Sequence, residues 1–73
     1  MAAVDEIRIT LAAARVNAGL TQDDVSKMLH VSKQTVVNWE KGKTEPKTTQ
    51  ARQLSQLYGL PYDVLIFLPS KAN

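Results

Sequence analysis

Apolar residues recur at intervals of three and four positions along most of the chain, the spacing that places them on one face of a helix. We find no alternating strand pattern, repeat or low-complexity segment. Residues 1–73 are therefore expected to form a single all-α domain, a compact bundle of five short helices. The predicted helices cover approximately residues 5–18, 22–29, 33–41, 48–58 and 61–67.

Polar residues mark the expected starts of the first two helices. Asp5 is predicted to cap the first helix, with Val4 and Ile9 forming a hydrophobic staple across its start. Thr21 and Asp24 have the spacing of a capping box, in which each side chain accepts a hydrogen bond from the backbone N–H of the other residue. A second helix should therefore begin directly after Thr21.

The later helices have clear signals at their ends. Ser32 is the expected cap of the third helix, and Gly42 should end it in the left-handed conformation. Pro46 indicates a loop, and Gly59 closes the fourth helix. Pro61 suits the first turn of a fifth helix. The residues expected on inward faces are Ile7, Leu11, Ala14, Ala18, Val25, Met28, Leu29, Ala51, Leu54, Leu57 and Tyr58.

The third predicted helix has two chemically different sides. Val36 and Trp39 lie on the side expected to face inward. The opposite arc, roughly 140° wide at helical spacing, holds Lys33, Gln34, Val37, Asn38 and Lys41. Glutamine and asparagine can bond adenine edges bidentately, lysine can reach guanine, and valine can contact a thymine methyl group. An ordinary solvated helix face has a similar composition, so the arc alone leaves both interpretations open.

Composition narrows the function classes. The chain has no cysteine and one histidine, which excludes disulfides and thiolate metal sites and argues against structural zinc; we expect no metal and no cofactor. The N-terminal residues lack the pattern of a signal peptide, and the longest apolar stretch, residues 64–68, is far shorter than the roughly 20 residues that span a bilayer. A cytoplasmic location is expected, with no membrane contact.

The distribution of charge along the chain indicates more about its function than the net charge of +2 does. Four of the nine basic residues lie between positions 33 and 47, where only Glu40 and Glu45 oppose them. Such a local excess attracts a phosphate backbone, although it also serves solubility. The four are Lys33, Lys41, Lys43 and Lys47.

The order and spacing of several short motifs resemble the helix-turn-helix of the phage repressor and Cro-like family, also called the XRE family of bacterial regulators. The likeness extends from about Leu11 to Leu65. The motifs are Gly19-Leu20-Thr21-Gln22, Val31-Ser32, Trp39-Glu40, Gly42-Lys43, Pro46 and Leu57-Tyr58-Gly59-Leu60. His30 departs from the pattern, since the turn usually has glycine there.

The resemblance implies a five-helix lambda-repressor-like fold and sequence-specific binding of double-stranded DNA by a small bacterial or phage transcriptional regulator, most often a repressor. Residues 33–41 would enter the major groove, with bases read by Lys33, Gln34, Val37 and Asn38. The phosphate contacts would come from Thr21, Gln22, Ser32, Lys41, Lys43 and Lys47. It also implies a structural salt bridge between Arg15 and Glu40.

The C-terminal segment leaves two questions open. Its apolar residues could pack across the two-fold axis of a homodimer that binds two half-sites, or against the first helix of the same chain. These residues are Val64, Ile66, Phe67 and Leu68. The alternative function is a protein-interaction module, such as an antitoxin or adaptor, that uses this segment. An enzyme is least supported, because the paired acidic residues Asp23 and Asp24 suit helix capping.

Overall fold

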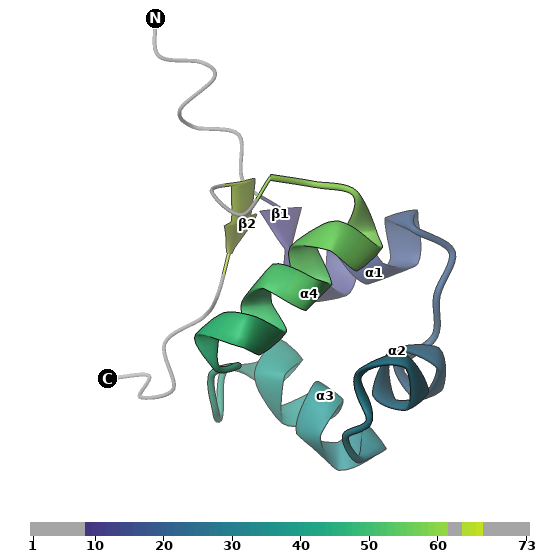
Figure 1. Ribbon diagram of the computed structural model, residues 1–73, viewed down its shortest axis with the longest axis vertical. Helices are drawn as coiled ribbons and strands as arrows, with labels where there is room; N and C mark the ends of the chain where they lie inside the picture. The colour runs from purple at the N-terminus through teal and green to yellow at the C-terminus, as the bar shows by residue number, and fades with distance from the viewer. Residues whose placement is uncertain (1–8, 62–63, 67–73) are drawn as a thin grey trace, which may run out of the picture.

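In the computed structural model, residues 9–61 and 64–66 are described, and they contain four α-helices and two short strands. Figure 1 shows the helices packed around one centre, with the two strands side by side at one edge. The elements are β1 (Ile9–Thr10), α1 (Leu11–Asn17), α2 (Gln22–Leu29), α3 (Lys33–Lys41), α4 (Thr48–Tyr58) and β2 (Leu65–Ile66).

The helix ends around α2 and α3 confirm the predicted capping. The Thr21 hydroxyl accepts from the Asp24 N–H at 3.0 Å, and the Asp24 carboxylate accepts from the Thr21 N–H at 2.9 Å. The Ser32 hydroxyl accepts from the Thr35 N–H at 3.1 Å and caps α3. Gly42 ends α3 in the left-handed conformation, with φ 78°. Local hydrogen bonding therefore fixes where both helices start.

A left-handed residue makes the corner between α2 and α3. His30 ends α2 with φ 58° and ψ 45°, a conformation that few residues other than glycine adopt. The next residue, Val31, donates its N–H to the Ser26 carbonyl at 2.9 Å, which closes the last turn of α2. The corner thus forms without the glycine usual at this position.

The first helix begins later than predicted. Ile9 and Thr10 are extended, and the Thr10 hydroxyl accepts from the Ala13 N–H at 3.1 Å, so Thr10 is the cap. The prediction of a helix from residue 5 is wrong at these two positions, because β-branched residues favour the extended conformation and threonine is a good cap. The proposed cap Asp5 and staple residue Val4, like Ile7, lie outside the described residues.

The fifth helix predicted over residues 61–67 is wrong in the part that the structure describes. Val64 donates its N–H to the Pro61 carbonyl at 3.0 Å in a turn, and the chain then enters β2. β2 is parallel to β1, with Leu65 opposite Ile9. Two β-branched residues, Val64 and Ile66, flank Leu65 and favour this pairing over a helix.

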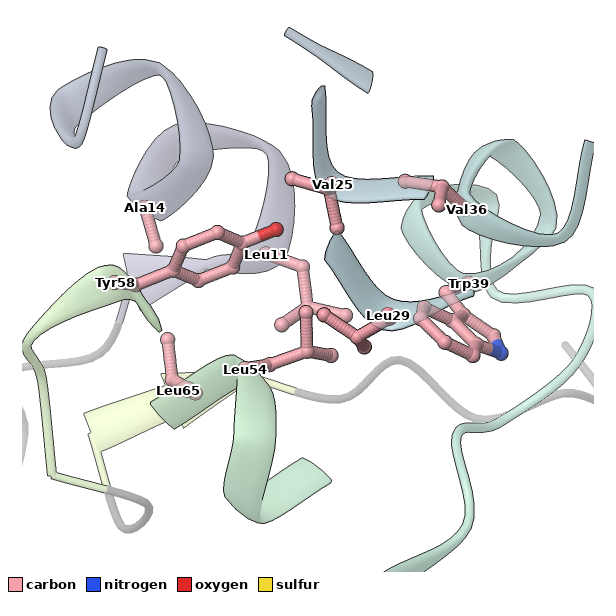
Figure 2. Packing of buried hydrophobic residues seen from close by; sticks show 9 residues of the cluster. All are labelled: Leu11, Ala14, Val25, Leu29, Val36, Trp39, Leu54, Tyr58 and Leu65. Carbon is pink, nitrogen blue, oxygen red and sulfur yellow. The ribbon is translucent and has the colours of Figure 1, made fainter. Parts of the chain in front are cut away.

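One hydrophobic core joins all four helices and β2 (Figure 2). Ala51 of α4 is buried as well. Two predicted core residues lie at the surface instead: Ala18 follows the end of α1, and Met28 is 53% exposed on α2. Ser26 takes the buried position on α2, with its hydroxyl donating to the Asp23 carbonyl at 2.7 Å. The clustered residues are Leu11, Ala14, Val25, Leu29, Val36, Trp39, Leu54, Tyr58 and Leu65.

None of the helices in residues 9–61 is both long and apolar enough to cross a membrane. The same part of the chain, together with residues 64–66, holds no group of three or more His, Asp or Glu side chains that could bind a metal ion.

Candidate nucleic-acid interface

The helices α2 and α3 form one end of the molecule, away from the paired strands (Figure 1). They pack against each other through buried residues of both helices, including Val25 and Val36. The sharp corner at His30 and the cap at Ser32 hold the two helices at a fixed angle. The outer side of α3 is therefore presented on a rigid support.

The two sides of α3 differ in how deeply their side chains are buried. Val36 and Trp39 are only 1% and 4% exposed, which anchors the helix in the core. On the other side Lys33 and Gln34 are exposed, while Val37 and Asn38 are half-buried; Lys41 is exposed as well. The Gln34 amide donates to the Asn38 side-chain oxygen at 3.0 Å. The four candidate base-reading residues thus share one helix, and two of them are hydrogen-bonded to each other.

The candidate phosphate contacts lie at the start of α2, at both ends of α3 and in the loop between α3 and α4. Thr21, Ser32, Lys41, Lys43 and Lys47 are exposed, and Gln22 is half-buried. The hydroxyls of Thr21 and Ser32 already accept hydrogen bonds as helix caps. Lys43 follows Gly42, the residue that ends α3, and its N–H donates to the Asn38 carbonyl at 2.9 Å. Lys47 lies further on, just before α4, where its N–H donates to the Gln50 side chain at 2.8 Å.

An ion pair links α1 to α3. The Arg15 Nε lies 2.7 Å from Glu40 Oε2, and Arg15 Nη2 donates to Glu40 Oε1 at 3.3 Å. Both side chains are largely buried, 15% and 8% exposed. The hydrogen bond to Glu40 raises the pKa of the Arg15 guanidinium above its ordinary value and outweighs the desolvation that lowers it. The pair therefore forms a charged contact inside the helix packing.

Two further contacts of this pair were not predicted. The Gln22 amide donates to Glu40 Oε1 at 3.0 Å, and Arg15 Nη1 donates to the Leu20 carbonyl at 2.9 Å. Gln22 and Glu40 are 18 positions apart, on helices whose mutual angle is set by packing. No spacing rule in the sequence predicts such a contact.

Tyr58 lies close enough to this pair to respond to its charges. The pKa of the Tyr58 phenol is raised from an ordinary value of 10.0 to about 12, mainly by burial and also by the Glu40 charge, while the Arg15 charge opposes both. Because the pKa is higher in the folded state, Tyr58 contributes stability that is complete below pH 10 and is lost as the pH rises to about 12.

We expect the free energy of unfolding to fall between pH 10 and pH 12 by at most about 2–3 kcal/mol more in the wild type than in Tyr58→Phe, which has no phenol to ionise. Urea denaturation of both proteins at each pH measures this difference. Parallel losses in the two proteins would show that lysine deprotonation alone causes the alkaline effect.

Comparison with known proteins agrees with this geometry. A family model described as helix-turn-helix matches residues 11–65. A Methanocaldococcus jannaschii protein named as an uncharacterized HTH-type transcriptional regulator is 39% identical over 49 residues, which cover 66% of this chain and 74% of that protein. No solved structure gives a significant match.

Proposed function

The chain belongs to the helix-turn-helix family, and we propose that it binds a specific double-stranded DNA operator as a transcriptional regulator that represses its target. The observation that carries this proposal is the division of α3. Val36 and Trp39 anchor the helix, while the opposite side holds three exposed polar residues and two half-buried ones, Val37 and Asn38. The relative named as a transcriptional regulator supports the same function.

In this proposal α3 lies in the major groove, which is wide enough to admit one helix. Gln34 and Asn38 supply amide groups for adenine edges, and Lys33 reaches guanine acceptors. Val37 lies between them on the same face and contacts a thymine methyl group. These side chains read sequence, because base edges differ between base pairs while phosphates do not.

The phosphate contacts position α3 in the groove. The start of α2 contributes the backbone N–H and side-chain amide of Gln22 together with the hydroxyl of Thr21, aided by the positive end of the helix dipole. Lys43 contacts the backbone beyond the other end of α3, and Lys41, Lys47 and Ser32 add weaker contacts. Binding should therefore weaken steeply as salt is added.

Selection of bound duplexes from a random DNA pool tests the function directly. We expect enrichment of one motif with a defined half-site, bound with an affinity that falls linearly with salt on logarithmic axes. A folded protein that enriches no motif and shifts no duplex at moderate salt would refute sequence-specific DNA binding.

Two substitutions distinguish residues that read DNA bases from residues that contact phosphates and position the protein. Gln34→Ala should weaken binding to the selected duplex by about 1–3 kcal/mol and relax the preference at one base pair. Lys43→Ala should weaken binding to all duplexes similarly and reduce the salt slope by about one. Titrations of both variants against the selected and a scrambled duplex at several salt concentrations measure these effects. If Gln34→Ala keeps both affinity and preference, Gln34 does not read a base.

We also propose that two copies bind symmetric half-sites about 34–36 Å apart. Val64 is half-buried beside β2 and is the candidate interface residue whose exposure the structure describes. Ile66 lies in β2, and Phe67 and Leu68 lie outside the described residues. Sedimentation of the protein with a duplex holding one or two half-sites tests the proposal, and a monomer on both would contradict it.

No described feature favours the antitoxin or adaptor function, since Leu65 is buried in the chain's own core.

A further inference from the structure

The Glu40 carboxylate accepts hydrogen bonds from two different elements at once. Its Oε2 accepts from Arg15 Nε at 2.7 Å, and its Oε1 accepts both from Arg15 Nη2 at 3.3 Å and from Gln22 Nε2 at 3.0 Å. The Glu40 side chain is only 8% exposed, so little water competes for these contacts. Hydrogen bonds to an ionised acceptor in such surroundings are stronger than those between neutral groups.

This arrangement fixes the orientation of the Gln22 amide. A carboxylate only accepts hydrogen bonds, so the amide must turn its NH₂ group, and not its oxygen, toward Glu40. One N–H of Gln22 then points to Glu40, and the second N–H remains for another acceptor. Gln22 is the first residue of α2, where the free backbone N–H groups of the helix also lie.

Arg15 adds a second link to the same place. Its Nη1 donates to the carbonyl of Leu20, two residues before Gln22, at 2.9 Å. The start of α2 is thus tied to α3 by the amide of Gln22, and through Arg15 by the backbone of Leu20. Both ties end on Glu40 or on its ion-pair partner.

We infer that Glu40 is a positioning residue for DNA binding, which holds the free N–H of the Gln22 amide in place to donate to a DNA phosphate. This inference rests on the proposed function. Glu40 does not touch DNA in this arrangement. It sets the distance between a phosphate contact at the start of α2 and the base-reading side of α3.

A double-mutant cycle tests the link between Gln22 and the ion pair. The two backgrounds are the wild type and the variant in which Arg15→Met and Glu40→Leu replace the pair by apolar side chains. In the wild type, Gln22→Ala should weaken binding to the selected duplex by about three- to tenfold, the effect of losing one hydrogen bond. In the apolar background the affinity should already be lower by a similar factor, and Gln22→Ala should change it by less than about twofold. Base preference should stay the same in all four proteins.

Lys43→Ala is the matched control, because Lys43 contacts neither Gln22 nor the ion pair through any side-chain hydrogen bond among the described residues. It should weaken binding by the same factor in both backgrounds. Equal effects of Gln22→Ala in the two backgrounds would overturn the inference, as would a Gln22→Ala protein that binds like the wild type. A wild type that binds no duplex would refute the proposed function itself.

Nuclear magnetic resonance of the free wild type provides a measurement that needs no folded variant. The Gln22 side-chain amide should show one proton that exchanges slowly with solvent. An amide that exchanges as fast as that of the exposed Gln53 would overturn the inference.

Discussion

Arg15→Met should lower the free energy of unfolding by about 3–5 kcal/mol, since it leaves the Glu40 carboxylate buried without its charged partner. Glu40 would keep one neutral donor, the Gln22 amide, which cannot replace the charge of a guanidinium. The Leu20 carbonyl would lose its side-chain donor at the same time. For a domain of this length, whose total stability is typically about 4–11 kcal/mol, that loss would remove a large share of the stability.

The double variant Arg15→Met, Glu40→Leu should recover much of this loss, because apolar side chains of similar size carry no desolvation penalty. Urea denaturation of the wild type, both single variants and the double variant measures the coupling energy. The surface pair formed by Lys27 and Asp23, with side chains 77% and 57% exposed, is the matched control, and Lys27→Met should change stability by less than about 1 kcal/mol. Strictly additive effects of Arg15→Met and Glu40→Leu would show that the buried pair contributes nothing as a pair.

Helix starts could be predicted where a side chain near in sequence satisfies the backbone. Thr21 with Asp24 and Ser32 with Thr35 are contacts over three residues, so the sequence contains all the information they need. The family resemblance covered the same segment, which explains why the limits of α2 and α3 agree with the prediction.

The two ends of the domain could not be predicted in the same way. Ile9 and Thr10 are extended because Leu65 and Ile66 pair with them across 56 residues of sequence. Helical periodicity in a short segment gives no information about such a distant partner. A two-residue strand is also too short to show an alternation of apolar and polar residues. β-branched residues at both sites were the only local signal.

From helical spacing alone, side-chain contacts at the candidate interface could also be predicted only where the residues lie on the same helix. Helical angles were sufficient to place Gln34 and Asn38 on the outer face of α3 and Trp39 on the inner face. They could not reveal that Gln22 donates to Glu40, because this contact depends on how α2 and α3 pack. Within one helix, the spacing of residues determines which way each side chain points. Between two helices, the packing determines which polar groups come into contact.

The second large loss of stability is expected for a substitution at the centre of the hydrophobic core. Leu54→Ala should lower the free energy of unfolding by about 3–5 kcal/mol, through lost burial and the cavity that remains. Leu54 is 1% exposed and is among the largest fully buried side chains of the described residues. Figure 2 shows it pointing from α4 toward Leu11 of α1 and Leu29 of α2. A cavity there would therefore loosen three helices at once.

Met28→Ala is the matched control for Leu54→Ala, because it also shortens a large apolar side chain but at a position 53% exposed; it should change stability by about 0.5 kcal/mol or less. Thermal and urea unfolding of both variants measures the difference. Because Leu54 is buried and lies outside the candidate interface, Leu54→Ala should lose DNA affinity only in proportion to its unfolded fraction, and a stabilising osmolyte should restore stability and affinity together. Equal stability of the two variants would mean that Leu54 is not part of a tightly packed core, and the rigid support inferred for α3 would fail with it.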